Sequence, residues 1–211
     1  MQNSAIHRPD ADRFQNITAI ETELRSTLPW LWAPAFKIGR NEGYDGEVFG
    51  ARAGPSDAIS AKNVIHEVCH CAEITLLPSR VWKRRVRQPY FEMRIRSYQT
   101  IGGERYYEPV TMQATERECR VGGMQLRLLE AGGYETQGFV ESFALTLKYM
   151  SDWYMGGDCP LNAHDPEKYT EEQQKWLDAR IALVRAAYDE YPLADIQERW
   201  STAMTWLEKT K

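Results

Sequence analysis

The residues of this chain with the clearest potential for chemistry are two histidines four positions apart, His66 and His70, with Glu67 between them. Side chains at positions i and i+4 of a helix lie on one face, so both imidazoles can reach a single metal ion. Glu67 can then take a proton from a water molecule at that ion. The HExxH spacing therefore predicts a site for one divalent cation, with Glu67 as the catalytic carboxylate.

A third protein ligand is expected, because catalytic metal sites usually have three and keep a position open. The metzincin continuation, which adds a glycine and a third histidine, is absent from the residues that follow His70. We therefore expect a carboxylate, and Glu118 is the best candidate because it lies in the first turn of a predicted helix that can aim it rigidly. Glu116 is the rival. Residues two apart on a helix point to different faces, so only one of the two can face the metal well.

A second predicted helix carries the motif. Residues 58–73 contain neither proline nor glycine, and the turn Gly54-Pro55-Ser56-Asp57 before them can cap a helix. The carboxylate helix is predicted over residues 115–130, with Thr115 and Glu118 as a capping box and Gly132-Gly133 closing it. Apolar periodicity predicts further helices over residues 13–28, 139–154, 170–190 and 193–208.

Strands are expected mainly in the first half of the chain. Residues 30–49 contain short apolar pieces between prolines and glycines, and residues 81–105 mix β-branched, aromatic and arginine residues. Gly102-Gly103 joins two strand-like runs as a hairpin would. Together with the helices, this pattern predicts an α+β fold in which a small sheet packs on the HExxH helix and the C-terminal half is mostly helical.

Composition sets the broad class of protein. The chain has 211 residues, 43% hydrophobic and 27% charged, which predicts a single domain spanning residues 1–211. The formal net charge of −4 makes nucleic acid an unlikely main partner. No apolar run is long enough to cross a membrane, and the four cysteines form no CxxC pair. We expect a cytoplasmic protein with free thiols.

The chain resembles the elongation factor P hydroxylases, a bacterial family with a zincin-like HExxH helix. The shared features are a Val-Phe strand (Val48-Phe49), a Val-Ile-His-Glu helix start (Val64 to Glu67), and a block from Glu118 to Tyr134 that matches at Glu118, Arg120, Ala131, Gly133 and Tyr134. The likeness extends over roughly residues 47–204. It departs at Cys71, where the family has an aromatic residue, and at Val121, where the family has proline. The resemblance implies a zincin-like fold, Glu118 as the third ligand, and hydroxylation of a modified lysine on elongation factor P.

Three further residues are candidates for binding a substrate. Tyr107 and Tyr134 can line a cleft, since a phenol often helps to stabilise developing negative charge in related sites, and Arg120 is the basic residue of the matched block. Packing in the core or at its rim is the simpler explanation for such tyrosines.

Two kinds of chemistry fit the same ligands. Two histidines and one carboxylate suit Fe(II) and dioxygen activation, whereas the same residues with zinc and a motif glutamate suit hydrolysis. The resemblance favours a protein-lysine hydroxylase, with a zinc metallopeptidase as the alternative. A third hypothesis is a non-catalytic binding protein with a relic metal site. All three leave the oligomeric state open and take a protein or peptide as the partner.

Overall fold

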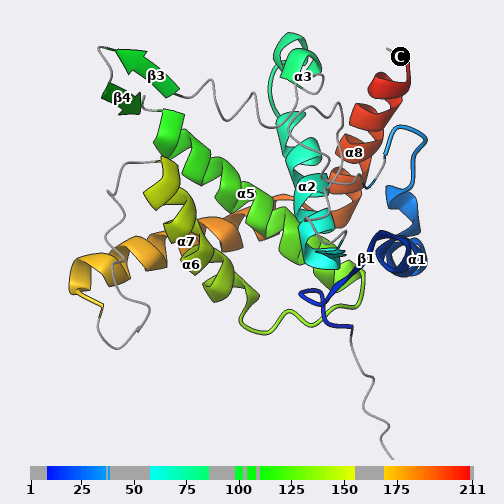
Figure 1. Cartoon of the computed structure of the whole chain (residues 1–211), viewed down its shortest axis with the longest axis horizontal. Helices are drawn as coiled ribbons and strands as arrows, with labels where there is room; N and C mark the ends of the chain where they lie inside the picture. Colours follow the sequence, from blue (N-terminus) through cyan, green and yellow to red (C-terminus); the bar gives the residue numbers. More distant parts are fainter. Residues whose placement is uncertain are drawn as a thin grey trace, which may run out of the picture.

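The computed structural model describes residues 9–36, 38, 58–85, 98–101, 104–107, 110–154 and 169–209, with side chains over part of these ranges. They are mostly helical (Figure 1). The helices are α1 (Ile17–Thr27), a 3-10 turn (Pro29–Leu31), α2 (Ala61–Ile74), α3 (Ser79–Arg85), α5 (Val110–Ala131), α6 (Phe139–Tyr154), α7 (Glu171–Glu190) and α8 (Leu193–Glu208). The strands are β1 (Phe14–Asn16), β2 (Ala58–Ser60), β3 (Tyr98–Ile101) and β4 (Glu104–Tyr107).

The helix that carries the motif starts later than the sequence predicts. Strand β2 occupies the first three residues of the predicted helix and pairs antiparallel with β1, with Phe14 opposite Ser60. Ser60 then caps α2, because its hydroxyl accepts a hydrogen bond from the Asn63 amide. A two-stranded sheet therefore leads directly into α2, but both of its strands come from residues that the sequence predicts as helix. The described residues of the segment 30–49, where strands are expected, form none.

Helix α5 is longer than predicted, and the predicted capping box at its start is wrong. The helix begins at Val110, so Thr115 and Glu118 lie inside it and Glu118 is available to point across to α2. The predicted end is confirmed: Gly133 has a φ of 76° and donates to the Glu130 carbonyl, while Tyr134 donates to the Leu129 carbonyl. This pair of hydrogen bonds is a Schellman cap, which needs the left-handed conformation that glycine adopts without strain.

The segment after α2 is only partly the β region that the sequence predicts. The hairpin is confirmed, since β3 pairs antiparallel with β4 and Ile101 lies opposite Glu104. The basic run at Lys83 to Arg85, however, belongs to helix α3. A run that mixes apolar and basic residues can form a short helix as well as a strand. Here Trp82 on α3 packs against Ile74 at the end of α2. The Val48-Phe49 strand lies outside the described residues.

Helix α2 is packed between α5 and α8 (Figure 1). Its buried side chains Val64, Ile65 and Val68 join the main core, to which α5 contributes Met124 and Leu128. Because α2 is buried on two sides, it is a rigid support for its polar residues His66 and His70.

Helix α5 also makes a close approach to α7 at Gly123. A Cβ atom added there would lie 2.6 Å from the Ala187 Cβ and from the Val184 carbonyl oxygen, closer than packed atoms allow. The helix backbones are therefore in direct contact at this point. This contact holds α5 at a set depth in the bundle, and with it the height of Glu118 above α2.

We expect Gly123→Ala to lower the free energy of unfolding by roughly 1–3 kcal/mol, because the added methyl group forces α5 and α7 apart. The usual gain in helix propensity on replacing glycine by alanine, about 1 kcal/mol, would act in the opposite direction. Urea denaturation of the two proteins measures the difference. A variant as stable as the parent would mean that the two helices can separate without loss.

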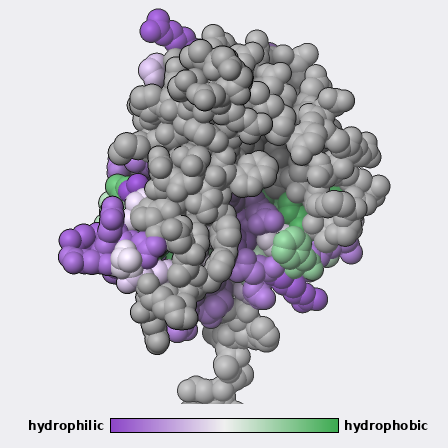
Figure 2. Space-filling model, turned by 60° about the vertical axis from the view of Figure 1, so that its left-hand side comes forward, coloured by the Kyte–Doolittle hydropathy of each residue, from purple (hydrophilic) through white to green (hydrophobic). Residues whose placement is uncertain are grey.

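Most large hydrophobic side chains of the described residues are buried, and the described surface is mainly polar (Figure 2). The coloured part of the face drawn in Figure 2 is mainly hydrophilic, with smaller hydrophobic areas between. Among the described residues, the large hydrophobic side chains that stay exposed are Phe14 and Leu183. Among the described helices, none combines the length and the apolar character that a membrane span requires.

Candidate metal centre

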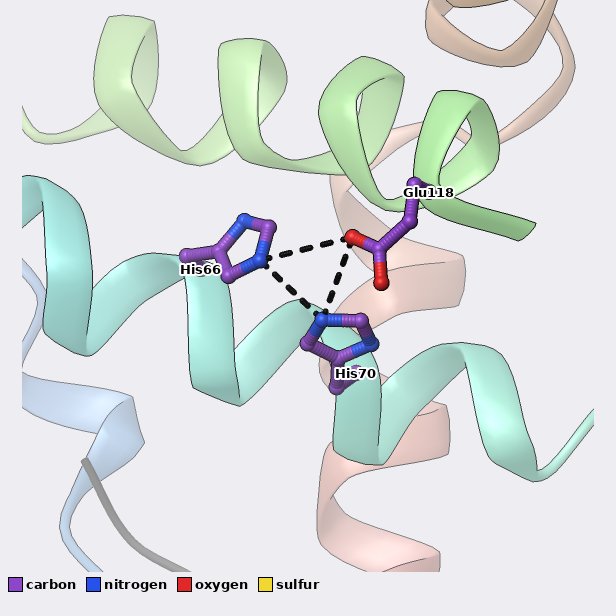
Figure 3. A group of neighbouring side chains, drawn as sticks. All are labelled: His66, His70 and Glu118. Atoms are coloured by element: carbon purple, nitrogen blue, oxygen red, sulfur yellow. Dashed lines mark hydrogen bonds and ion pairs between the residues drawn. The ribbon is translucent and has the colours of Figure 1, made fainter. Parts of the chain in front are cut away.

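Three side chains from two helices converge on one point, as Figure 3 shows: His66 and His70 from α2, and Glu118 from α5. The two Nε2 atoms lie 3.0 Å apart, and one Glu118 carboxylate oxygen lies 3.5 Å from His66 Nε2 and 3.4 Å from His70 Nε2. The side chains are largely enclosed, with exposed fractions of 21%, 9% and 12% for His66, His70 and Glu118. The sequence-predicted ligands are thus brought together.

The separations fit a single divalent ion. A tetrahedral ion with bonds of about 2.0 Å holds its ligand atoms about 3.3 Å apart, and an octahedral ion with bonds of about 2.1 Å holds adjacent ones about 3.0 Å apart. The three distances in the triangle are close to these values. Two imidazole nitrogens and one carboxylate oxygen also form a donor set that both Zn(II) and Fe(II) accept. The residues present therefore can hold one metal ion.

The local electrostatics favour a bound cation. Burial lowers the pKa of His66, as does neighbouring His70, and the carboxylates of Glu118 and Glu67 offset only part of this effect. Burial also disfavours charge on His70, but the Glu118 carboxylate outweighs it and raises the pKa of His70 above its ordinary value. A positive charge at the centre is thus stabilised by Glu118, and a metal ion would replace the proton that His70 otherwise attracts.

Glu67 lies immediately beside the triangle along the chain and is half-buried. The charge of its carboxylate shifts the pKa values of His66 and His70 upward, although burial and His70 outweigh this effect at His66. The motif glutamate thus contributes negative charge at the edge of the site. Cys69 and Cys71 are buried free thiols whose pKa values are raised by burial. Neither sulfur belongs to the group of ligand atoms that converges at His66, His70 and Glu118.

A buried glutamine of α5 contacts His66 at Nδ1, the ring nitrogen that does not face the other two ligands. Gln125 is 1% exposed; its Oε1 lies 3.1 Å from His66 Nδ1, and its Nε2 donates to the Lys62 carbonyl at 2.8 Å. It lies seven residues, or two helical turns, after Glu118, so both residues occupy the face of α5 that is turned toward α2.

A second polar contact joins the same two helices next to the triangle. Glu73, 1% exposed, accepts hydrogen bonds from Arg117 and from Arg120, with both shortest N–O distances at 2.8 Å. Burial opposes the charge on Glu73, but the two guanidinium groups outweigh it and lower its pKa. Because Arg117 precedes Glu118 and Glu73 follows His70 by three residues, this ion cluster holds α2 and α5 in the register that closes the triangle.

The remaining predicted site residues lie elsewhere or outside the described part. Tyr134 is fully buried beyond the end of α5, where its hydroxyl donates to Glu23 of α1 at 2.8 Å. Thirteen residues of helix, about 20 Å, separate Glu118 from the end of α5, so this phenol is not beside the triangle. Arg120 pairs with Glu73, as described above. Tyr107 is in β4, and its side chain lies outside the described residues.

The choice between the two candidate glutamates is clear in the structure. Glu118 is the one that faces the histidines, whereas Glu116 is exposed. Sequence reasoning missed Gln125, Glu73 and Arg117. A signal for Gln125 was available, because a glutamine seven residues from a proposed ligand shares its helix face. Glu73, three residues after His70, shares a face in the same way, but its partners depend on how α2 and α5 pack.

Comparisons of the chain with models of protein families, with curated proteins and with solved structures find no match.

Proposed function

We propose that this chain is a metal-dependent enzyme that holds one divalent ion through His66, His70 and Glu118 and acts on a protein or peptide. The convergence of the three donor atoms within 3.5 Å of one another carries this proposal. Structural metal sites usually employ four protein ligands, whereas a three-ligand set leaves coordination positions for water or substrate. Three ligands and an adjacent carboxylate, Glu67, are what a catalytic site needs.

Hydroxylation of a lysine side chain is the favoured reaction, on the strength of the resemblance to the elongation factor P hydroxylases at His66, Glu67, His70 and Glu118. When bound, Fe(II) would supply dioxygen chemistry at this triad. The protein's own part is to present three ligands from two buried helices, to exclude bulk water, and to orient solvent or substrate through the Glu67 carboxylate. The free buried cysteines Cys69, Cys71 and Cys119 fit a reducing, cytoplasmic setting.

Peptide hydrolysis is the second candidate, and the order of residues within the HExxH motif favours it. In that reaction zinc would supply Lewis acidity. Glu67, adjacent to His66, would accept a proton from the attacking water and pass it to the leaving amine. The third candidate is a non-catalytic binding protein with a relic metal site. It would be supported if His66, His70 and Glu118 bound a metal ion but neither reaction took place.

The deciding experiment begins with metal analysis of protein purified without added metal. We expect about one equivalent of iron or zinc, and a protein that neither contains nor takes up a divalent metal would refute the proposal. The iron-loaded protein under dioxygen, and separately the zinc-loaded protein, are then incubated with elongation factor P carrying its modified lysine, and the product masses are measured by mass spectrometry. A gain of one oxygen atom supports hydroxylation, while cleavage without that gain supports the hydrolase.

The Glu67→Gln variant tests the role of the motif carboxylate. It keeps the size of the side chain and removes the charge, so we expect unchanged metal content and a fall in turnover of roughly 10²–10⁴-fold, the usual contribution of a general acid or base. Asn63→Asp, an exposed change one turn earlier on α2, is the matched control and should leave turnover intact. Full activity of Glu67→Gln would remove Glu67 from the mechanism.

A further inference from the structure

Gln125 is a buried polar side chain that the HExxH motif does not predict and that the ligand triad does not include. A buried amide is costly unless its hydrogen-bonding groups are paired, and Gln125 is 1% exposed. Both ends of this amide have partners on α2: His66 Nδ1 and the Lys62 carbonyl. Its position therefore connects the backbone of α2 to the ring of one proposed ligand.

The orientation of this amide is decided by the backbone. A carbonyl oxygen can only accept hydrogen bonds, so the amide group that faces Lys62 must be the NH2 group. The Gln125 carbonyl oxygen is then the atom 3.1 Å from His66 Nδ1. The reversed amide would set two acceptors against each other at Lys62, at a distance of 2.8 Å, and is excluded on that ground.

The orientation of the Gln125 amide also determines which nitrogen of the His66 imidazole is protonated. Since the Gln125 oxygen can only accept, His66 Nδ1 must carry a proton and donate it. A neutral imidazole has one ring proton, so His66 Nε2 carries a lone pair and no proton. Nε2 is the atom that points at His70 Nε2 and at the Glu118 carboxylate (Figure 3).

We propose that Gln125 is a positioning residue, which holds His66 as the Nδ1–H tautomer with Nε2 directed at the metal centre. The chain of contacts runs from the Lys62 carbonyl through the Gln125 amide to His66, and it sets both the tautomer and the rotation of the ring before any ion binds. Outer partners of this kind typically account for 10–100-fold in metal affinity. The inference rests on the proposed metal-binding function, but the tautomer is a property of the metal-free protein.

The first test is nitrogen NMR of the metal-free, ¹⁵N-histidine-labelled protein at about pH 8, where an ordinary histidine is neutral. We expect His66 to show a protonated Nδ1 and an unprotonated Nε2, and Gln125→Met, which has similar volume and no hydrogen bond, to lose this preference. A wild-type His66 protonated at Nε2 would overturn the proposal.

The second test is zinc titration of the same proteins. Gln125→Met should bind Zn²⁺ 10–100-fold more weakly than the parent. Gln173→Met is the matched control: it removes a buried glutamine from the α7 capping box, and should change stability but neither the His66 tautomer nor zinc affinity. Equal zinc affinity of the parent and Gln125→Met would refute the positioning role.

Different results would refute the proposed metal-dependent function and the positioning role of Gln125. If the parent protein takes up no metal, the proposed function is lost whatever the NMR shows. If it takes up metal while His66 has no fixed tautomer or Gln125→Met binds normally, the function stands and the role of Gln125 is lost. Urea denaturation of each variant ensures that any weakened binding is measured on folded protein.

Discussion

Replacing Glu118 by glutamine should reduce affinity for a divalent ion by roughly a thousandfold, or about 4 kcal/mol. The binding free energy of a zinc site, on the order of 10–16 kcal/mol, is shared among its ligands, so the loss of one accounts for a few kcal/mol. The amide keeps the size of the carboxylate but removes the negative charge that stabilises a cation beside His66 and His70. Competition titration with a chelating dye, using Zn²⁺ and Fe²⁺ separately, measures the change.

Glu116→Gln is the matched control for this experiment, because it is the same substitution two residues earlier on an exposed face of α5. It should bind metal as the parent does. The control also decides between the two glutamates that the sequence left as rivals. If Glu116→Gln lost the metal and Glu118→Gln kept it, the triangle seen in the structure would not be the metal site.

Replacing Glu73 by glutamine should lower the free energy of unfolding by about 3 kcal/mol at neutral pH. Removing one partner of a buried ion pair leaves the other charge without compensation, which typically costs about 3–5 kcal/mol. We expect the lower part of that range because the side chains of Arg117 and Arg120 are 27% and 33% exposed and can be partly hydrated. Urea denaturation of parent and variant gives the difference.

The control for Glu73 is Glu141→Gln, which makes the same change in the exposed ion pair between Glu141 and Arg185. Surface pairs contribute little, so this variant should stay within about 1 kcal/mol of the parent. If Glu73→Gln and Glu141→Gln lowered the free energy of unfolding equally, burial of the ion pairs of Glu73 would add nothing to stability.

The stability that Glu73 contributes should also decrease in acid. Its pKa is lowered in the folded protein, so its contribution is fully present above the ordinary glutamate pKa of about 4.3 and is lost as the pH falls through the folded value. The stability difference between the parent and Glu73→Gln should therefore be constant near neutrality and shrink in acid. A difference that grew in acid would contradict the assignment.

The placement of the two histidines and much of the scaffold around them were predictable from local patterns. The four-residue spacing of His66 and His70 places both imidazoles on one helix face whatever surrounds that helix. The bounds of α6, the capping box that starts α7 at Thr170 and the Gly133 cap of α5 follow from interactions within a few residues, and the structure confirms them. Predictions failed where neighbouring elements decide. Residues 58–60 form a strand because β1 is there to pair with them. Helix α5 begins at Val110, before Thr115, because continuation of the helix outweighs a local capping pattern.

The sequence by itself determined which residue types could bind a metal and that two of them lie one turn apart on a single helix. Only the tertiary structure decided that Glu118, not Glu116, completes the triangle, that Gln125 lies behind His66, and that Glu73 joins α2 to the arginines of α5. The physical reason is the range of the interactions. Periodicity fixes directions within one helix. The depth and register at which two helices meet depend on contacts between distant parts of the chain, such as the close approach of α5 to α7 at Gly123.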